Sequence, residues 1–215
     1  MAKFRNRINQ ISHFNQLVQS LLKEADGLLE KGPLDPERAA NLLKSAALAI
    51  EELYDMAHTD TLTQIANSLY YKECVVDKLE AFCRGNNRED VAEYIFGIAD
   101  LNGLKQINDT IGYQAGDAML IKAVLKIKSL LRPEDLIVRR SDFADEFIII
   151  LPVYRGLPDN LEKIEKGIVK RLTDDQALMA VGFVYLSQYK KFDEAEIAAV
   201  KAMHQHKAFK NRPLA

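Results

Sequence analysis

The chain has 215 residues, a hydrophobic share of 48% and a formal net charge of -2 at pH 7. This composition provides one sizeable core plus a small accessory segment, and it excludes a chain that binds polyanions over its whole surface. Basic residues gather only near the C-terminus, at Lys201, Lys207, Lys210 and Arg212. This cluster has two possible interpretations, a solvated chain terminus and a local basic patch. We therefore expect no nucleic-acid partner.

No apolar run approaches the roughly 18 residues that a membrane-spanning helix needs, so we expect no membrane span. The N-terminal sequence MAKFRNRINQ lacks the apolar stretch of a signal peptide. The two cysteines, Cys74 and Cys83, lie in one predicted helix at a separation of roughly 13 Å, too far apart for a disulfide. Free thiols are typical of a reducing compartment, which predicts a cytoplasmic protein.

The N-terminal region predicts two helices. The first spans residues 4–31 and ends at Gly32-Pro33, and the second begins near Asp35-Pro36. Apolar residues repeat at heptad spacing in both, which favours an antiparallel hairpin or pairing with a second copy of the chain. The rows are Phe4, Ile11, Val18 and Ala25 with Phe14, Leu21 and Leu28, then Leu42, Ala49 and Met56 with Ala46 and Leu53. We expect a homodimer, with a protein partner on these helices as a further expectation.

After residue 57 the pattern changes, which predicts a helical segment over 1–57 and a main domain over 58–215. Apolar runs and turn signals predict a chain order of helix, strand, helix, strand, strand, helix, strand, helix. The expected helices are 61–83, 114–131, 158–172 and 193–207, and the expected strands are 94–99, 136–138, 147–151 and 178–186. This order predicts an α+β domain of the ferredoxin-like kind, with a central mixed sheet flanked by helices.

Acidic side chains stand at two strand ends. Asp100 closes the strand YIFGIAD, and Asp145 and Glu146 precede the strand FIIIL. Carboxylates at neighbouring strand ends can share a divalent cation, with phosphate oxygens and water completing its shell. Solvated turn carboxylates are the other interpretation of the same pattern.

Three motifs extend this interpretation. They are DTLTQIAN at 60–67, DLNGLKQINDTIGYQAGDAML at 100–120 and FADEFIIILP at 143–152. Together they make the chain from residue 60 onward resemble the GGDEF family of cyclic di-GMP signalling. The resemblance implies a nucleotidyl-cyclase palm, Mg²⁺ or Mn²⁺ as cofactor, and two GTP molecules condensed where two protomers meet.

The resemblance also implies roles for individual residues. It assigns the metal to Asp100 and Asp145, and catalysis to Asp145 together with Glu146. Guanine recognition falls to Asn108 and Asp117, whose amide and carboxylate can pair with the donors of the guanine edge. Phosphate binding is assigned to the backbone amides of three consecutive residues and to two side chains of the last helix: Gly103, Leu104 and Lys105, then His206 and Lys210.

A product-inhibition site of the RxxD type would use Arg132 and Asp135. The sequence around Pro133 is also compatible with a plain turn that carries surface charges. This segment therefore leaves two interpretations open, a cyclic di-GMP site and a structural turn.

The signature itself departs from the family. Phe143 and Ala144 replace the two glycines, so close approach of the backbone to a nucleotide is hindered, and the Phe143 ring can fill the nucleotide's space. The family's preceding arginine is matched by Arg139 or Arg140, with one or two extra residues in the hairpin. Earlier in the chain, Gln64 stands where the family has glycine.

We therefore expect a signalling protein whose degenerate GGDEF domain binds GTP and Mg²⁺ (or Mn²⁺) in a regulatory role. An active diguanylate cyclase is one alternative, and cyclic di-GMP is then its product and a second ligand. A module that binds protein but no nucleotide is the other.

Overall fold

The computed structural model describes residues 16, 19–23, 25–27, 36–86, 90–140, 145–155, 161–173 and 179–210. The chain divides into two compact units, Met1–Leu62 and Thr63–Ala215. The predicted first helix lies largely outside the described residues, and the parts of it that are described are helical. None of the helices in the described ranges is both long and apolar enough to cross a bilayer.

The first unit contains α2 (Pro36–His58), which begins at the predicted proline. The predicted heptad row of α2 is its shielded side: Ala49 is buried, and Leu42, Ala46, Leu53 and Met56 are half-buried. Several large apolar side chains lie outside that row and are exposed, namely Leu43, Leu48, Ile50 and Tyr54. The apolar surface of α2 is therefore wider than one heptad seam.

The second unit is built on a four-stranded sheet with the order β2-β3-β1-β4. Its strands are β1 (Val91–Leu101), β2 (Leu136–Arg139), β3 (Glu146–Tyr154) and β4 (Met179–Tyr185). The predicted α+β class is confirmed, and all four strands lie where the apolar runs predicted them. The ladders between these strands are antiparallel.

The mixed character expected of the sheet is limited to one isolated parallel bridge, between Ala66 and Val138. The apolar run of β1 does not indicate whether its neighbouring strands are parallel or antiparallel to it. A strand buried on both faces has the same continuous pattern in parallel and antiparallel sheets.

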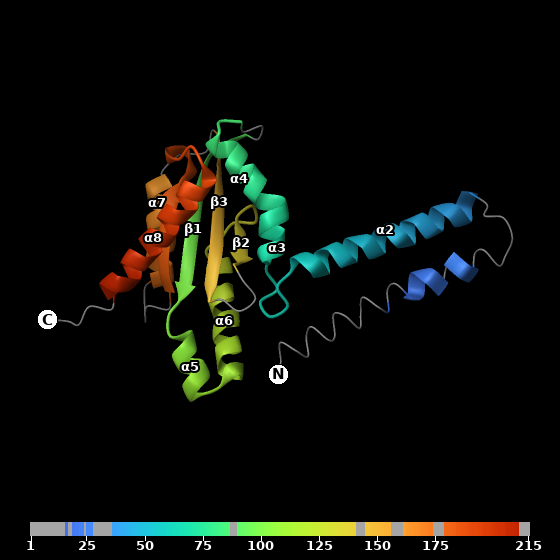
Figure 1. The fold of residues 1–215 in the computed structure, drawn as a ribbon, viewed down its shortest axis with the longest axis horizontal. Coiled ribbons are helices and arrows are strands. Elements are labelled where there is room, and N and C mark those ends of the chain that lie inside the picture. Colours follow the sequence, from blue (N-terminus) through green and yellow to red (C-terminus); the bar gives the residue numbers. More distant parts are fainter. Residues whose placement is uncertain are drawn as a thin grey trace. The chain divides into compact units, whose positions relative to one another are not determined.

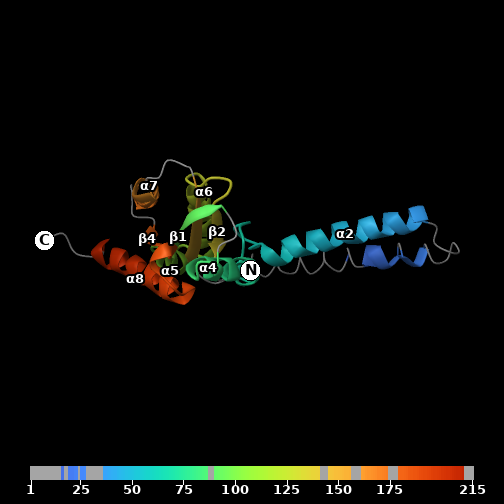
Figure 2. The ribbon, with the colours of Figure 1, turned by 90° about the horizontal axis from the view of Figure 1, so that it is seen from above.

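Helices cover both faces of the sheet, with α4 and α8 on one side and α6 and α7 on the other (Figure 2). The helical elements of this unit are α3 (Ser68–Tyr70), the π-helical η1 (Tyr71–Val75), α4 (Val76–Cys83), α5 (Leu104–Thr110), α6 (Tyr113–Lys128), α7 (Leu161–Thr173), the 3₁₀ turn η2 (Leu186–Gln188) and α8 (Phe192–Lys210). Cys74 and Cys83 are free thiols, as predicted.

The α8 helix packs directly on the edge strand β4. A Cβ added to Gly182 would lie 2.2 Å from the backbone nitrogen of Met203, so only glycine allows this approach. Phe192 at the start of α8 meets Phe96 of β1 edge to face, with ring centroids 5.1 Å apart. These contacts fix the height and rotation of α8 over the sheet, and thereby the positions of the charged side chains that it carries.

Two local expectations were wrong. The helix expected from residue 61 begins only at Ser68, because the Asn67 side chain caps it by accepting hydrogen bonds from the backbone nitrogens of Leu69 and Tyr70, each at 3.0 Å. Gln64, before this cap, has a φ of 55°. The short helix α5 was not expected, because its seven residues carry too few apolar positions to show a helical period.

Candidate active site at the end of strand β1

Three acidic residues meet at the end of β1. Figure 1 shows that this end of the strand leads into α5. Asp100 is the register partner of Glu146 in β3, so their side chains share one face of the sheet. The backbone nitrogen of Leu101 donates to the carbonyl oxygen of Asp145 at 2.9 Å. The structure therefore brings together Asp100, Asp145 and Glu146 from two segments of the chain.

A lysine of α8 neutralises the central carboxylate. The ammonium of Lys207 donates to Oδ1 of Asp100 at 2.5 Å. The Asp100 side chain is 9% exposed and the Lys207 side chain is 37% exposed. Burial raises the pKa of the Asp100 carboxyl, the Lys207 hydrogen bond and charge lower it, and the charges of Asp145 and Glu146 raise it again, with a net upward shift. The carboxylate is buried among like charges and depends on one cation that reaches it from the surface.

Glu146 has a different partner. Nη1 of Arg140 donates to the Glu146 carboxylate at 2.7 Å, and Nη2 of the same guanidinium donates to Glu196 of α8 at 3.3 Å. Burial lowers the pKa of Arg140, but the bond to Glu146 and the charges of Glu146 and Glu196 outweigh it and raise the pKa. Glu146 is thus tied into an ion-pair bridge between the β3 hairpin and α8.

The buried phenol of Tyr71 lies near this bridge. Burial raises the pKa of Tyr71, and Glu196, Arg140 and Asp193 are the charges that act on it. Its hydroxyl has no hydrogen-bond partner.

The α5–α6 hairpin carries the residues expected to read guanine. Asn108 and Asp117 are both half-buried. A Cβ on Gly116 would lie 1.9 Å from Oδ1 of Asn108, so the Asn108 amide rests on the backbone of the residue before Asp117. The two polar side chains expected to pair with guanine therefore belong to one packed unit.

The residues expected to bind phosphates through their backbone lie between the acidic cluster and this hairpin. Gly103 has a φ of 79° and precedes α5, a conformation that glycine adopts without strain. Leu104 is buried and Lys105 is exposed.

The acidic cluster fits a hard divalent cation in the chemistry of its donors, because Mg²⁺ and Mn²⁺ prefer carboxylate oxygens. Within the described residues, however, no group of three or more His, Cys, Asp or Glu is arranged to hold a metal. Asp100 and Asp145 would supply two carboxylates, since Glu146 is paired with Arg140. The remaining ligands would have to come from water or from a bound phosphate.

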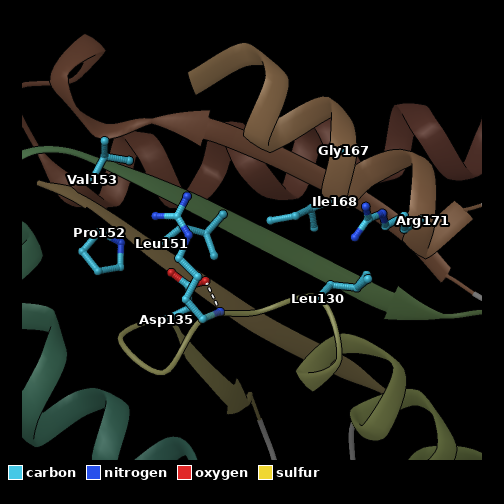
Figure 3. Close-up of a pocket in the computed structure, with 9 residues that line it drawn as sticks. Leu130, Asp135, Leu151, Pro152, Val153, Gly167, Ile168 and Arg171 are labelled. Atoms are coloured by element: carbon cyan, nitrogen blue, oxygen red, sulfur yellow. Dashed lines mark hydrogen bonds between the residues drawn. The ribbon is translucent and has the colours of Figure 1, made fainter. Parts of the chain in front are cut away.

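A second site lies between the turn before β2 and α7. It is a pocket of about 190 Å³ (Figure 3). Its lining residues are Leu130, Arg132, Asp135, Leu151, Pro152, Val153, Gly167, Ile168 and Arg171. Oδ2 of Asp135 accepts a hydrogen bond from the backbone nitrogen of Arg132 at 2.7 Å, which closes the turn. The pocket combines an apolar wall with two arginines and one aspartate.

The sequence profile described as "Diguanylate cyclase, GGDEF domain" matches residues 57–212. The chain belongs to the GGDEF family. Among curated relatives, "Bifunctional diguanylate cyclase/cyclic di-GMP phosphodiesterase MucR" of Pseudomonas aeruginosa is 28% identical over 136 residues, which cover 63% of this chain and 18% of that protein. "Diguanylate cyclase TpbB" of the same organism is 33% identical over 101 residues, 46% of this chain and 21% of that protein. The chain thus spans about a fifth of the length of these relatives.

Solved structures of GGDEF domains have the same fold. A structure that describes an interaction mode between a microbial GGDEF domain and cyclic di-GMP has a TM-score of 0.55 and 26% identity, covering 72% of this chain and 95% of that one. The coiled coil and GGDEF domain of DgcB from Caulobacter crescentus has a TM-score of 0.62 and 20% identity, covering 80% of this chain and 91% of that one. The family and the fold expected from the motifs are both confirmed.

On this GGDEF domain, two neighbouring side chains of α8 have different partners. Nδ1 of His206 accepts a hydrogen bond from the backbone nitrogen of Val181 at 3.1 Å, so the imidazole caps the outer edge of β4. Lys207, one residue further, points to the acidic cluster instead. One residue turns a helix by about 100°, which is why the side chains of His206 and Lys207 leave α8 in different directions.

Several other positions bear on the expectations from sequence. Lys210 ends α8, and its side chain lies outside the described residues, as do Phe143 and Ala144 of the altered signature. Of the two arginines matched to the family's arginine, Arg139 is buried and Arg140 forms the bridge to Glu146 and α8. The sequence did not predict the contacts of Lys207, Arg140 and Glu196, or the place of Arg171 in the wall of the pocket. A signal existed for α8, since Glu196 and Lys207 are eleven residues apart and share a helix face with the buried Ala199 and Met203.

Proposed function

We propose that the GGDEF domain binds GTP together with Mg²⁺ or Mn²⁺ at the end of β1, and acts as a regulatory nucleotide-binding domain in cyclic di-GMP signalling. The observation that carries this proposal is the meeting of Asp100, Asp145 and Lys207 beside the α5–α6 hairpin. Asp100 and Asp145 would hold the cation, which when bound neutralises charge on triphosphate oxygens.

The protein's own groups would divide the remaining work. Asn108 and Asp117 would accept and donate along the guanine edge, with the amide held in place by its contact with Gly116. The backbone amides of Gly103 to Lys105 would meet phosphate oxygens, and the Lys207 ammonium would add positive charge. A regulatory role is supported by the loss of both signature glycines, because Phe143 and Ala144 restrict backbone approach to the ligand.

Calorimetric titration with GTP and Mg²⁺ tests the proposal. We expect saturable binding that is lost when Asp100 and Asp145 are both changed to alanine. Absence of binding at millimolar GTP, or a thermal stability that GTP and Mg²⁺ leave unchanged, would remove the proposal and favour a protein-interaction module.

An active diguanylate cyclase is the second candidate, supported by relatives that carry this name. In that reaction the 3′-oxygen of each GTP attacks the α-phosphorus of the other, two phosphodiester bonds form, and two pyrophosphates and two protons are released. Glu146 would assist at the metals or at the attacking hydroxyl once released from Arg140. Incubation with GTP and chromatography of the products decides between the two, since the regulatory proposal expects no cyclic di-GMP.

Cyclic di-GMP itself is proposed as a ligand of the pocket at Arg132 and Asp135. The second arginine there, Arg171, supports this proposal because a phosphodiester and a guanine edge both present acceptors to guanidinium groups. The pocket's volume of about 190 Å³ is below that of a usual ligand site, so it would hold one guanine or phosphate of the ligand. Titration with cyclic di-GMP, repeated on Arg171→Ala, tests it.

We further propose that the N-terminal helices join two chains. The exposed Leu43, Leu48 and Ile50 of α2 support a contact larger than one hairpin seam. The DgcB structure contains a coiled coil together with its GGDEF domain. Light scattering coupled to size-exclusion chromatography should give the mass of a dimer, and a monomer mass at high micromolar concentration would contradict the proposal.

A further inference from the structure

An exposed aromatic side chain stands at the tip of the α5–α6 hairpin (Figure 1). Tyr113 is the first residue of α6 and is 76% exposed, more than any other large apolar residue in the part of the chain that the structure describes. A single exposed tyrosine is common on protein surfaces and by itself indicates no function. What distinguishes Tyr113 is its place beside the residues expected to read guanine.

Tyr113 and Asp117 lie on the same side of α6. They are four residues apart, and residues at this spacing are neighbours on a helix, with about 5–6 Å between their Cβ atoms. A helical side chain leans towards the N-terminus of its helix, which turns Asp117 towards the turn that carries Tyr113. The carboxylate and the aromatic ring therefore border the same patch of surface.

The neighbouring helix α5 contributes Asn108 to this patch. Its Oδ1 would lie 1.9 Å from a Cβ built on Gly116, so the amide rests on α6. Gly116 is three residues after Tyr113, which places the ring about one helical turn nearer the tip of the hairpin than this contact. Gly103, at the other end of α5, begins the backbone expected to bind phosphates. The order along the hairpin is therefore phosphate backbone, polar pair and aromatic ring.

The backbone that carries the ring is held by hydrogen bonds. The carbonyl oxygen of Gly112 accepts from the backbone nitrogens of Ala115 at 3.1 Å and Gly116 at 3.3 Å. The backbone nitrogen of Gly112 itself donates to the carbonyl oxygen of Ile107 at 3.1 Å. A tyrosine has only two rotatable side-chain bonds, so placing the Tyr113 ring on a ligand from this fixed position costs little conformational entropy.

We propose that the Tyr113 ring stacks on the base of the nucleotide whose edge Asn108 and Asp117 read. A planar base that is held by its edge leaves its faces to be covered, and an aromatic ring one turn away can cover one of them. Every base has such a face, so this contact adds affinity without choosing between bases. The inference rests on the proposed function, and it adds a residue that separates affinity for the base from selectivity for guanine.

The first test compares GTP with inorganic tripolyphosphate, which carries phosphate charge but no base. Both are titrated into the full chain with Mg²⁺ present, by calorimetry. Tyr113→Ala should weaken GTP binding by about 10-fold, within the range for loss of one stacking aromatic ring, and leave the affinity for tripolyphosphate unchanged. Tyr113→Phe keeps the ring and should bind GTP as the natural chain does. Leu125→Ala changes another exposed apolar residue of α6 and should leave both affinities unchanged.

A second measurement reports the stacking itself. The chain contains no tryptophan, so Tyr113→Trp introduces a single indole fluorophore. GTP should quench its emission as the site fills, because the base lies on the indole ring, and tripolyphosphate should not. Leu125→Trp is the matched control and should show no quenching at the same GTP occupancy.

The outcomes separate this inference from the proposed function. Equal GTP affinity in Tyr113→Ala and the natural chain, or no quenching of Tyr113→Trp at GTP saturation, would overturn the stacking role and leave the proposed function intact. An equal loss of affinity for tripolyphosphate would also overturn it, because the substitution would then act on the hairpin and not on the base. A natural chain that binds no GTP at millimolar concentration would overturn both.

Discussion

Two aspartates of this domain are held in different ways. Oδ2 of Asp135, in the turn before β2, accepts from a backbone nitrogen, that of Arg132, at 2.7 Å. Asp100, at the end of β1, is held by the side-chain ammonium of Lys207 at 2.5 Å. Burial raises the pKa of both carboxyls. A carboxylate bound by its own turn belongs to the local fold, whereas one bound by a side chain of α8 depends on how that helix packs.

The largest expected effect comes from Asp100. Asp100→Asn should reduce cation-dependent GTP affinity on the order of 100-fold, because only one of the two carboxylates that would hold the cation, that of Asp145, remains. Calorimetry in the presence of Mg²⁺ measures it. Asp135→Ala is the matched control and should leave this affinity unchanged; an equal loss in both variants would erase the distinction between the two aspartates.

Removal of the guanidinium of Arg171 should affect the other site alone. Arg171→Ala should weaken cyclic di-GMP binding by about 10-fold, since a hydrogen bond to a charged group contributes about 1.5–3 kcal/mol. GTP affinity should stay the same. Competition between the two nucleotides, followed by fluorescence of a labelled GTP analogue, measures both effects, and a matching loss of GTP affinity would show that the two sites are not separate.

The contact between Gly116 and Asn108 offers a finer change at the GTP site. Gly116→Ala should push the Asn108 amide aside and lower the preference for GTP over ATP by about 10-fold, since hydrogen bonds to base edges carry the discrimination. Fold stability should change by less than about 1 kcal/mol, because alanine favours a helix and offsets the displacement. Asn108→Ala should have the same effect on selectivity; an unchanged preference in both variants would remove guanine reading from this hairpin.

The two aspartate substitutions should rank in the opposite order for stability: Asp135→Ala should lower the unfolding free energy more than Asp100→Asn does. Asp135→Ala should lose about 0.5–1.5 kcal/mol of unfolding free energy, because it removes the hydrogen bond that closes the turn. Asp100→Asn should lose less, since it relieves a buried charge cluster.

The raised folded-state pKa of Asp100 means that its contribution favours folding at low pH and is lost as pH rises through that pKa. The natural chain should therefore gain stability relative to Asp100→Asn as pH falls from about 7 towards about 4. Urea unfolding across this range measures it, and an opposite slope would contradict the assignment.

The smallest expected effect lies outside both sites. Gln64 has a φ of 55°, and it stands where the family has glycine. Gln64→Gly should stabilise the domain by about 1 kcal/mol, because a side chain in the left-handed region is strained. Thermal melting measures the gain, and a lower melting temperature would mean that contacts of the Gln64 side chain outweigh the strain.

Most of the fold could be predicted from the chain itself. The apolar runs located β1 to β4, and a single proline marked the start of α2. Position-specific motifs selected Asp100, Asn108 and Asp117 as candidate site residues, and these assignments stay predictions. Strand direction and the short helix α5 were not predictable, since neither leaves a periodic apolar signature.

The partners of the charged side chains of α8 could not be predicted from the sequence, although the helix face that carries them could. Lys207 meets Asp100 across 107 positions of the chain, and Arg140 meets Glu196 across 56. Such pairs depend on the rotation of α8, which is set by the contact of Gly182 with the helix backbone. The motif assigned His206 to the triphosphate, whereas the structure shows His206 bonded to Val181 and its neighbour Lys207 paired with Asp100.

The most direct test of the account is the structure of the full chain crystallised with Mn²⁺ and a non-hydrolysable GTP analogue. An anomalous peak for Mn²⁺ at the carboxylates of Asp100 and Asp145, with the Lys207 ammonium on the triphosphate, is the predicted result. Nucleotide bound elsewhere, or no Mn²⁺ at these two carboxylates, would contradict it.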